Sequence, residues 1–289
     1  MSQDDPTPSH PPAGSADGSL ALARAATPDQ RAATAGSLDH TRPASGRPQG
    51  LLPGHRLVRV TGGDDWLKAE AFVYEMYVKI GYTDPSPRHR VEELAQFAER
   101  SIFNVVMDED GQVIGTIRNI YGRYDDLPVN QFDRTDHADP DPVCELSSLV
   151  VDPTQRSTGV IEHLYRAGWR DAWRSGSSAL VALIDDWLFD VFKDTYRLPF
   201  RRIGVGQHYM GTEPVPVALP LVAPAYLDHV RENPHFWAWI LEGILPSEVN
   251  DWSLPIVLVD PSQANQGPAG ADEGIEPPRR FPIGPDLSR

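Results

Sequence analysis

Residues 145–164, ELSSLVVDPTQRSTGVIEHL, decide the fold, because they predict a strand, a turn and a helix in direct succession. Residues 143–151 are rich in apolar side chains, as a strand is, and residues 160–175 place apolar side chains along one side of a helix. Residues 152–159 form the turn between them, and Gly159 falls at the first turn of the helix.

Such a corner is suited to an anion, because a helix N-terminus presents unpaired backbone N–H groups and the positive end of the helix dipole. Gly159 would let the backbone approach a phosphate closely, and Arg156 would add a charge-assisted hydrogen bond. An ordinary connection with a surface arginine fits the same spacing, so this pattern alone leaves both interpretations open.

The hydrophobic period on both sides of this stretch predicts the other elements. Strands are expected at 55–61, 102–107, 112–120, 179–184, 200–205 and 215–219, and helices at 64–81, 88–100, 186–196, 223–232 and 235–243. The acidic turn at 108–111 predicts a hairpin, and the polar residues 121–142 predict a long loop of the kind that often acts as a lid. A hairpin before a strand-helix-strand unit predicts a mixed sheet flanked by helices, in the α/β (α+β) class.

Composition divides the 289 residues into four segments. Residues 1–52 and 261–289 are rich in proline and small polar residues and lack a sustained apolar period, so both tails are expected to be disordered. The folded domain is expected at 53–221, followed by a C-terminal helical extension at 222–260.

The net charge and the cysteine content indicate which binding partners and which cellular compartment to expect. The net charge is −15, and phosphate backbones and anionic lipids would repel it, so nucleic-acid and membrane-surface partners are not expected. The single cysteine, Cys144, is expected in the core and suits a cytoplasmic protein. We expect no membrane-spanning segment, no signal peptide and no metal site, because none of the corresponding patterns occurs.

The turn carries a resemblance to a known superfamily. Residues 149–164, LVVDPTQRSTGVIEHL, resemble the acyl-thioester motif of the GNAT acyltransferases, Val-x-Pro-x-x-Arg-x-x-Gly-x-Gly/Ala followed by a helix. Arg156 and Gly159 match the motif, whereas Ile161 stands where the second Gly or Ala is usual. This departure favours a carrier-protein donor over free coenzyme A.

The flanks narrow the resemblance to one branch. Residues 145–151, ELSSLVV, are similar to the Glu-Leu-Ser-Arg-x-x-Val stretch of acyl-homoserine lactone synthases and long-chain N-acyl amino acid synthases, with Ser148 in place of the arginine. Residues 198–219 resemble the C-terminal strand pair of the same enzymes. The resemblance covers about residues 55–220.

This resemblance implies a GNAT-like twisted mixed sheet that opens between its fourth and fifth strands, where the arm of an acyl-phosphopantetheine thioester enters. It implies no permanently bound cofactor, and an acyl carrier protein or coenzyme A thioester as co-substrate. A backbone N–H of the fourth strand would polarise the thioester carbonyl, a contact worth about 3–4 kcal/mol. The residues expected along the arm and its phosphate are Leu149, Val150, Val151, Arg156, Ser157, Thr158, Gly159 and Val160.

The implied reaction is direct attack of an amine on the thioester, which requires a base and an acid. Glu145 is the candidate base, because burial in an apolar strand would raise its pKa; a structural carboxylate is the alternative. Ser147 and Ser148 would relay a proton or bind the acceptor, or else satisfy backbone groups. Tyr196 and Tyr209 are candidate acids, with ordinary core packing as the alternative.

The leading hypothesis is therefore an N-acyltransferase that moves an acyl group from an acyl carrier protein or coenzyme A thioester to the amine of a small molecule, such as an amino acid or a biosynthetic intermediate. An acetyl-coenzyme A-dependent N-acetyltransferase is the second hypothesis. A GNAT-like fold that only binds a ligand is the third.

Overall fold

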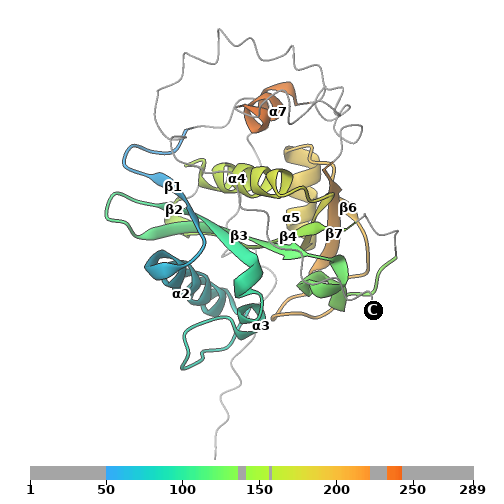
Figure 1. Cartoon of the computed structure of the whole chain (residues 1–289), viewed down its shortest axis with the longest axis horizontal. Coiled ribbons are helices and arrows are strands. Elements are labelled where there is room, and N and C mark those ends of the chain that lie inside the picture. The colour runs from blue at the N-terminus through green and yellow to red at the C-terminus, as the bar shows by residue number, and fades with distance from the viewer. Residues whose placement is uncertain (1–49, 136–140, 156–157, 222–232, 243–289) are drawn as a thin grey trace, which may run out of the picture.

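The computed structural model describes residues 50–135, 141–155, 158–221 and 233–242, and a seven-stranded sheet runs through them in the order β1-β2-β3-β4-β5-β7-β6 (Figure 1). Neighbouring strands are antiparallel except for β4 and β5, which are parallel, so the sheet is mixed as expected. The strands are β1 (Arg56–Val60), β2 (Ser101–Met107), β3 (Val113–Gly122), β4 (Val143–Val151), β5 (Ala179–Ile184), β6 (Arg201–Arg202) and β7 (Val215–Pro220).

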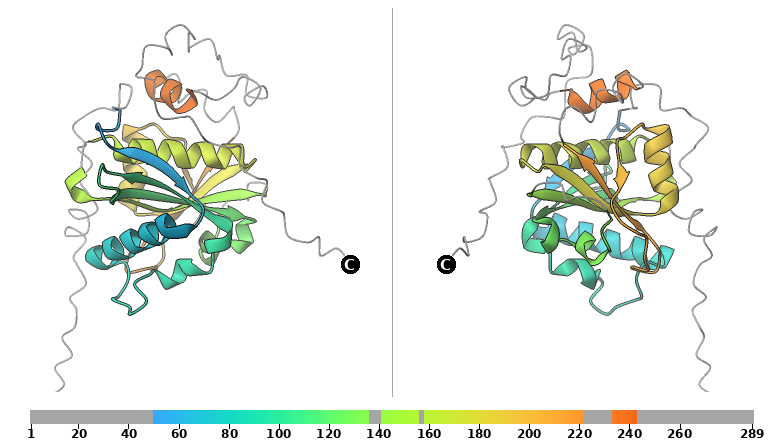
Figure 2. Two further views of the ribbon diagram at one scale, coloured as in Figure 1. Left: turned by 60° about the vertical axis from the view of Figure 1, so that its left-hand side comes forward. Right: turned by 90° about the vertical axis from the view of Figure 1, so that its right-hand side faces the viewer.

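Helices cover both faces of the sheet (Figure 2). On one face lie α2 (Gly63–Ile80) and the short α3 (Glu92–Ala95), and on the other lies α4 (Val160–Arg174), with α7 (Pro234–Leu241) packed outside it. After β5 the chain forms α5 (Asp186–Asp190), which continues as a π-helical turn over Val191–Thr195. Each face therefore has its own hydrophobic core, one built around α2 and the other around α4 and α7.

The α2 helix forms where the sequence predicts it. Its buried side chains recur every three or four residues, including Trp66, Val73 and Tyr77, and two aspartates occupy its first turn. Gly81 ends the helix in the left-handed conformation, at φ 81°, and its N–H donates to the carbonyls of the last turn.

The α4 helix packs closely against the sheet because glycine occupies the contact on both sides. A Cβ at Gly168 would lie 2.9 Å from Cδ1 of Ile117, and one at Gly115 would lie 2.8 Å from Cγ1 of Val160. The amide of Asn119 also donates to the Gly168 carbonyl at 2.8 Å. These contacts place the N-terminus of α4 beside the end of β4.

The C-terminal helix α7 packs on α4 through aromatic side chains and arginines. Phe236 is 1% exposed and lies in the same core as the apolar face of α4. Arg166 and Arg170 of α4 donate to the carbonyls of Glu242 and Ile240, at 3.0 and 3.2 Å.

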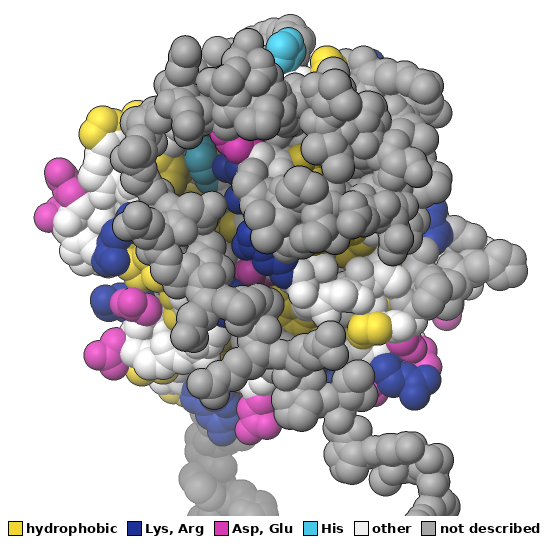
Figure 3. Space-filling view, turned by 45° about the horizontal axis from the view of Figure 1, so that its top comes forward, with side chains coloured by type: hydrophobic (Ala, Val, Ile, Leu, Met, Phe, Trp, Pro, Cys, Tyr) yellow, Lys and Arg dark blue, Asp and Glu magenta, His cyan; other side chains and the backbone are white. Residues whose placement is uncertain are grey.

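On the surface, basic side chains are gathered near the middle of the face seen in Figure 3, next to hydrophobic ones. The expected helix at 235–243 is thus confirmed as α7, whereas the one at 223–232 lies outside the described residues.

The expected hairpin is confirmed in β2 and β3, and the expected strands at 55–61, 143–151, 179–184 and 215–219 are confirmed in β1, β4, β5 and β7. The helix at 160–175 is confirmed as α4. The tails predicted to be disordered fall almost entirely outside the described residues.

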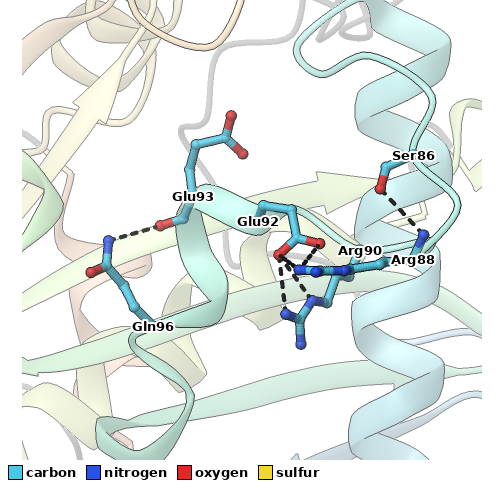
Figure 4. Close-up of polar contacts among 6 residues, drawn as sticks. All are labelled: Ser86, Arg88, Arg90, Glu92, Glu93 and Gln96. Atoms are coloured by element: carbon cyan, nitrogen blue, oxygen red, sulfur yellow. Dashed lines mark hydrogen bonds and ion pairs between the residues drawn. The ribbon is translucent and has the colours of Figure 1, made fainter.

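The helix predicted over 88–100 is wrong in its length. His89 takes a left-handed conformation at φ 48° and Val91 is extended, so α3 begins only at Glu92. Arg88 and Arg90 converge on the Glu92 carboxylate, whereas Glu93 points to the other side of the turn (Figure 4).

Two further predictions need correction. The segment 121–142 is not simply a polar loop, because it contains two 3-10 turns and buries Tyr124, Leu127, Val129 and Phe132. The strand expected at 200–205 is only Arg201–Arg202, because the chain then leaves β7: the Val205 N–H donates to the Asp133 carbonyl, and a Cβ at Gly204 would lie 2.3 Å from that oxygen. Within the described ranges, no helix combines the length and apolarity needed to cross a membrane.

Candidate active site

The sheet opens between β4 and β5. The two strands pair over only three positions, Cys144 with Leu180, Glu145 with Val181 and Leu146 with Ala182. Beyond them β4 continues to Val151 paired with β3, and β5 continues to Ile184 paired with β7. The opening that the resemblance implied is therefore confirmed, and the edge of β4 from Ser147 onward has no β5 partner.

A β-bulge marks the start of this opening. Arg118 of β3 pairs with Ser147 and Thr116 pairs with Val150, so Ser148 and Leu149 together face one residue of β3. Ser148 takes a left-handed conformation at φ 48°, and its carbonyl accepts a hydrogen bond of 2.9 Å from the Thr116 hydroxyl. The bulge bends β4 at the point where β5 diverges.

Glu145 lies beside the bulge on the α2 side of the sheet. It is 2% exposed, and its Oε2 accepts a hydrogen bond of 2.9 Å from the Val129 N–H. Burial raises the pKa of the Glu145 carboxyl to about 8, against the opposing effects of that N–H group and of the Arg118 charge. A carboxyl that titrates near neutral pH is suited to accept a proton.

Arg118 lies on the same side of β3, over the rings of Trp66 and Phe103, which contact each other edge to face with centroids 4.7 Å apart. Its Cζ is 5.4 and 5.3 Å from the two ring centroids, and the residue is 2% exposed. Burial lowers the pKa of the guanidinium to about 10, with the negative charge of Glu70 as the largest opposing effect. Nε and Nη2 have no hydrogen-bond partner among the described residues.

A small cleft that is open to solvent lies in front of this arginine, with a cavity volume of about 10 Å³, roughly the space of one water molecule. Helix α2, α3 with its N-cap, and strands β2, β3 and β4 all contribute to its wall. The lining residues are Glu70, Val73, Val91, Leu94, Phe103, Arg118 and Ser148.

Two tyrosines border the same region. Burial raises the pKa of the Tyr209 hydroxyl to about 12; the Gln131 side chain opposes this shift and the Glu145 charge adds to it. Burial also raises the pKa of Tyr77, and there Ser148 and the Arg118 charge oppose the shift. Tyr209 packs edge-on against Phe132, with ring centroids 5.8 Å apart. Of the two predicted acids, the fold therefore brings Tyr209 near Glu145.

Tyr196 lies elsewhere, in the core around α4. Its hydroxyl donates to Glu162 in the first turn of α4, at 3.2 Å, and its ring contacts Phe192 and Phe236. Burial and the Glu162 carboxylate both raise the pKa of Tyr196. The fold therefore places it near the N-terminus of α4 rather than with Glu145.

The turn from β4 to α4 holds the residues expected to contact a phosphate. Gly159 is buried and left-handed, at φ 80°, and α4 begins directly after it at Val160. The Thr158 hydroxyl donates to the Gln155 carbonyl at 2.6 Å, which closes the turn. Leu149 and Val151 pack toward the α4 core and Val150 toward the α2 core. Arg156 and Ser157 lie outside the described residues.

Sequence reasoning missed several residues of the site. Arg118 could have been found from the sequence, because it is the only charged residue within the strand Val113–Gly122. Burying an unpaired charge costs free energy, so such a residue is a candidate for a functional role. Tyr77 and Val91 carry none, because their spacing is that of ordinary core residues. Cys144 is buried as expected and accepts a hydrogen bond from Asn119. The described residues include no cluster of His, Cys, Asp and Glu that could hold a metal ion.

The family model of the N-acyl amino acid synthase FeeM matches residues 68–219, which is more than half of the chain. Comparison with curated proteins gives no match.

Solved structures with a similar arrangement include three acyltransferases. FeeM, an N-acyl amino acid synthase from uncultured soil microbes, is 18% identical, with 59% of this chain and 92% of that chain covered and a TM-score of 0.44. BjaI, a coenzyme A-dependent acyl-homoserine lactone synthase with SAM and isopentyl-CoA, is 13% identical over 62% and 89%, with a TM-score of 0.48. A putative phosphinothricin N-acetyltransferase is 20% identical over 57% and 98%, with a TM-score of 0.41. The chain belongs to the FeeM family of N-acyl amino acid synthases and is an acyltransferase that transfers acyl groups to amines.

Proposed function

We propose that this acyltransferase takes an acyl group from a phosphopantetheine thioester, on an acyl carrier protein or coenzyme A, and transfers it to the amine of an amino acid or a similar small molecule. The observation that carries the proposal is the edge of β4 after Leu146, which pairs with no other strand of the described residues and follows the buried Glu145 carboxyl. An extended acyl-carrying arm would run along that edge as a strand would, beside a group able to accept a proton.

The donor would lie along Leu149, Val150 and Val151, where β4 has no β5 partner. Backbone N–H groups aimed at a developing oxyanion are worth about 3–4 kcal/mol each. At the end of the strand, the N-terminus of α4 would receive the phosphate of the arm. The residues assigned to that contact are Arg156, Ser157, Thr158, Gly159 and Val160.

The acceptor would attack the thioester carbonyl directly. Glu145 would take the proton from the ammonium group, the amine nitrogen would form the new C–N bond, and the C–S bond would break. The nitrogen of the tetrahedral intermediate would lose a second proton as the C–S bond breaks. The departing thiolate would take a proton from Tyr209 or Tyr196, and the second proton from the nitrogen would restore that hydroxyl through water, which closes the proton balance. Ser147 and Ser148, at the bulge, would hold the acceptor or a relaying water.

We also propose the domain limits and the setting of this reaction. Residues 53–221 would form the catalytic domain and 222–260 an extension that includes α7. The protein would act in the cytoplasm, with no nucleic acid as partner. Ile161, in the place of the usual Gly or Ala, favours an acyl carrier protein as donor.

The test is a matrix of donors and acceptors analysed by mass spectrometry. Acyl carrier protein and coenzyme A thioesters of short and long chains are each combined with amino acids and with simple amines. We expect N-acylated products from amino acids, with carrier-protein thioesters as the better donors. Transfer of acetyl groups alone would support an N-acetyltransferase instead, and no transfer from any donor would support a binding module.

A further inference from the structure

We propose that Arg118 binds the carboxylate of the acceptor, so that the cleft in front of it selects α-amino acids over amines that lack this group. The inference rests on the proposed function, because it assigns a binding site for the acceptor of that reaction. It concerns a residue that the sequence analysis did not single out.

The first observation is that Arg118 is buried without a partner. It is 2% exposed, Nε and Nη2 bond to nothing among the described residues, and it forms no ion pair with them. The adjacent rings of Trp66 and Phe103 stabilise the cation only in part. Burying a guanidinium whose N–H groups have no acceptor costs free energy. This cost indicates that a bound ligand supplies the missing acceptor.

The second observation is that Arg118 borders a small cleft, although Nε and Nη2 are themselves buried. Arg118 and Ser148 both line the cleft, on adjacent strands. A guanidinium presents parallel N–H groups that match the two oxygens of a carboxylate, which a lysine does not. A carboxylate that enters this cleft would satisfy the otherwise unpaired donors once the guanidinium turns towards it.

The charges around the cleft favour a zwitterion over a simple anion. Glu70 lines the same cleft, and its carboxylate and that of Glu145 act on Arg118 without pairing with it. A fatty acid or a phosphate would be attracted by Arg118 but repelled by these acids. An amino acid carries an ammonium group as well, which the same acids attract.

The position of the cleft connects this contact to the reaction. Ser148 forms the bulge at which β4 leaves β5, so the cleft ends where the thioester would lie. The amine and the carboxylate of an α-amino acid share one carbon atom. A carboxylate held by Arg118 would thus bring the amine beside the bulge, on the face of the sheet that carries Glu145.

The experiment compares acceptor pairs that differ only in the carboxylate, such as phenylalanine with 2-phenylethylamine and leucine with isopentylamine. The quantity measured is the ratio of kcat/KM within a pair, for the wild type and for Arg118→Met and Arg118→Lys. We expect Arg118→Met to lower the ratio by about 30-fold or more, through KM for the amino acid, because one partner of a buried charged contact is removed. Arg118→Lys should restore part of it, since the charge remains but the paired N–H geometry is lost.

The matched control is Arg170→Met. Arg170 is also a buried arginine, at 8% exposed, but it lies on α4 and bonds to α7, on the opposite face of the sheet. The ratio should not change in this variant. Thermal unfolding of every variant shows whether it retains the fold.

Titration calorimetry with phenylalanine and with 2-phenylethylamine, in the absence of donor, measures the same contact without turnover. Stronger binding of phenylalanine supports the inference even if a variant does not fold, and even if no acyl transfer occurs, which would overturn only the proposed function. A wild type that transfers acyl groups equally well to both members of a pair would overturn the inference. So would an Arg118→Met enzyme that retains the wild-type ratio.

Discussion

The backbone N–H of Val129 donates to Oε2 of Glu145 at 2.9 Å, so the segment between β3 and β4 supplies the hydrogen bond of the buried carboxyl. Val129 itself is fully buried, in one of the two 3-10 turns of that segment. The bond orients the carboxyl, and burial keeps its pKa far above that of an exposed glutamate.

Glu145→Gln should reduce kcat by about 100-fold or more, which is the usual size of a general-base contribution. Glutamine keeps the shape of the side chain and an oxygen for the Val129 N–H, so the loss should not come from unfolding. Since the pKa of Glu145 is about 8, wild-type kcat should rise with pH up to about 8 and then level off. The variant should lack this rise. Steady-state kinetics between pH 6 and pH 10 test it, and a variant with wild-type kcat would exclude Glu145 as the base.

The same substitution should change how stability depends on pH. Burial raises the pKa of Glu145 from 4.5 in the unfolded chain to about 8 in the fold. Between these values the folded protein binds up to one more proton than the unfolded chain, so rising pH favours unfolding by up to about 1.4 kcal/mol per pH unit. Glu145→Gln removes this slope. Urea unfolding at several pH values between 5 and 8 measures it, and parallel curves for the two proteins would contradict the assignment.

Tyr209→Phe tests whether Tyr209 is the general acid of the reaction. If the hydroxyl protonates the departing thiolate, its loss should lower kcat by about tenfold to 100-fold with little change in KM for the acceptor. The ring contact with Phe132 remains, so the fold should persist. Tyr196→Phe is the matched variant near the N-terminus of α4, and comparison of the two identifies which hydroxyl acts. Unchanged kcat in both would remove both tyrosines from the mechanism.

Gly211→Ala should destabilise the protein far more than Gly176→Ala. Both glycines are left-handed, at φ 71° and 78°, so an alanine costs about 1–2 kcal/mol of backbone strain at either position. A Cβ at Gly211 would also lie 2.2 Å from the carbonyl oxygen of Gly81, whereas nothing lies within 4 Å of one at Gly176. Thermal unfolding of the two variants measures the difference. Equal losses would mean that the loop beside Tyr209 moves freely away from Gly81.

Phe236→Ala should destabilise the fold by about 3–5 kcal/mol, as a large aromatic truncation in a core does. Phe236 is 1% exposed and contacts Tyr196 and Trp239. Denaturant unfolding tests this value. A loss below about 1 kcal/mol, typical of a surface substitution, would mean that α7 is not part of the folded core.

Local sequence signals predicted most of the sheet. The runs at β4 and β5 are apolar and bounded by turn residues, and Gly81 and Gly159 mark one end of α2 and the start of α4. Elements whose ends depend on tertiary partners were predicted less well. The strand after Phe200 is short because the backbone stops pairing with β7 and bonds instead to Asp133, a residue distant in sequence.

The candidate site was predicted only where it lies on one continuous stretch. Glu145 and the bulge serines belong to β4, so a motif could find them. Arg118, Val129 and Glu70 come from three other segments and meet Glu145 or the cleft only after folding. No spacing along the chain relates them, because the contacts depend on strand register and on helix packing.

The most direct test of direct acyl transfer is a single turnover with an acyl carrier protein thioester and nitrogen-15-labelled phenylalanine, followed by mass spectrometry of both the product and the intact protein. The account predicts an amide that contains the labelled nitrogen, one free thiol per amide, and no acylated protein at any time. Hydrolysis of the thioester without amide formation, or an acylated form of the chain that appears before the product, would contradict it.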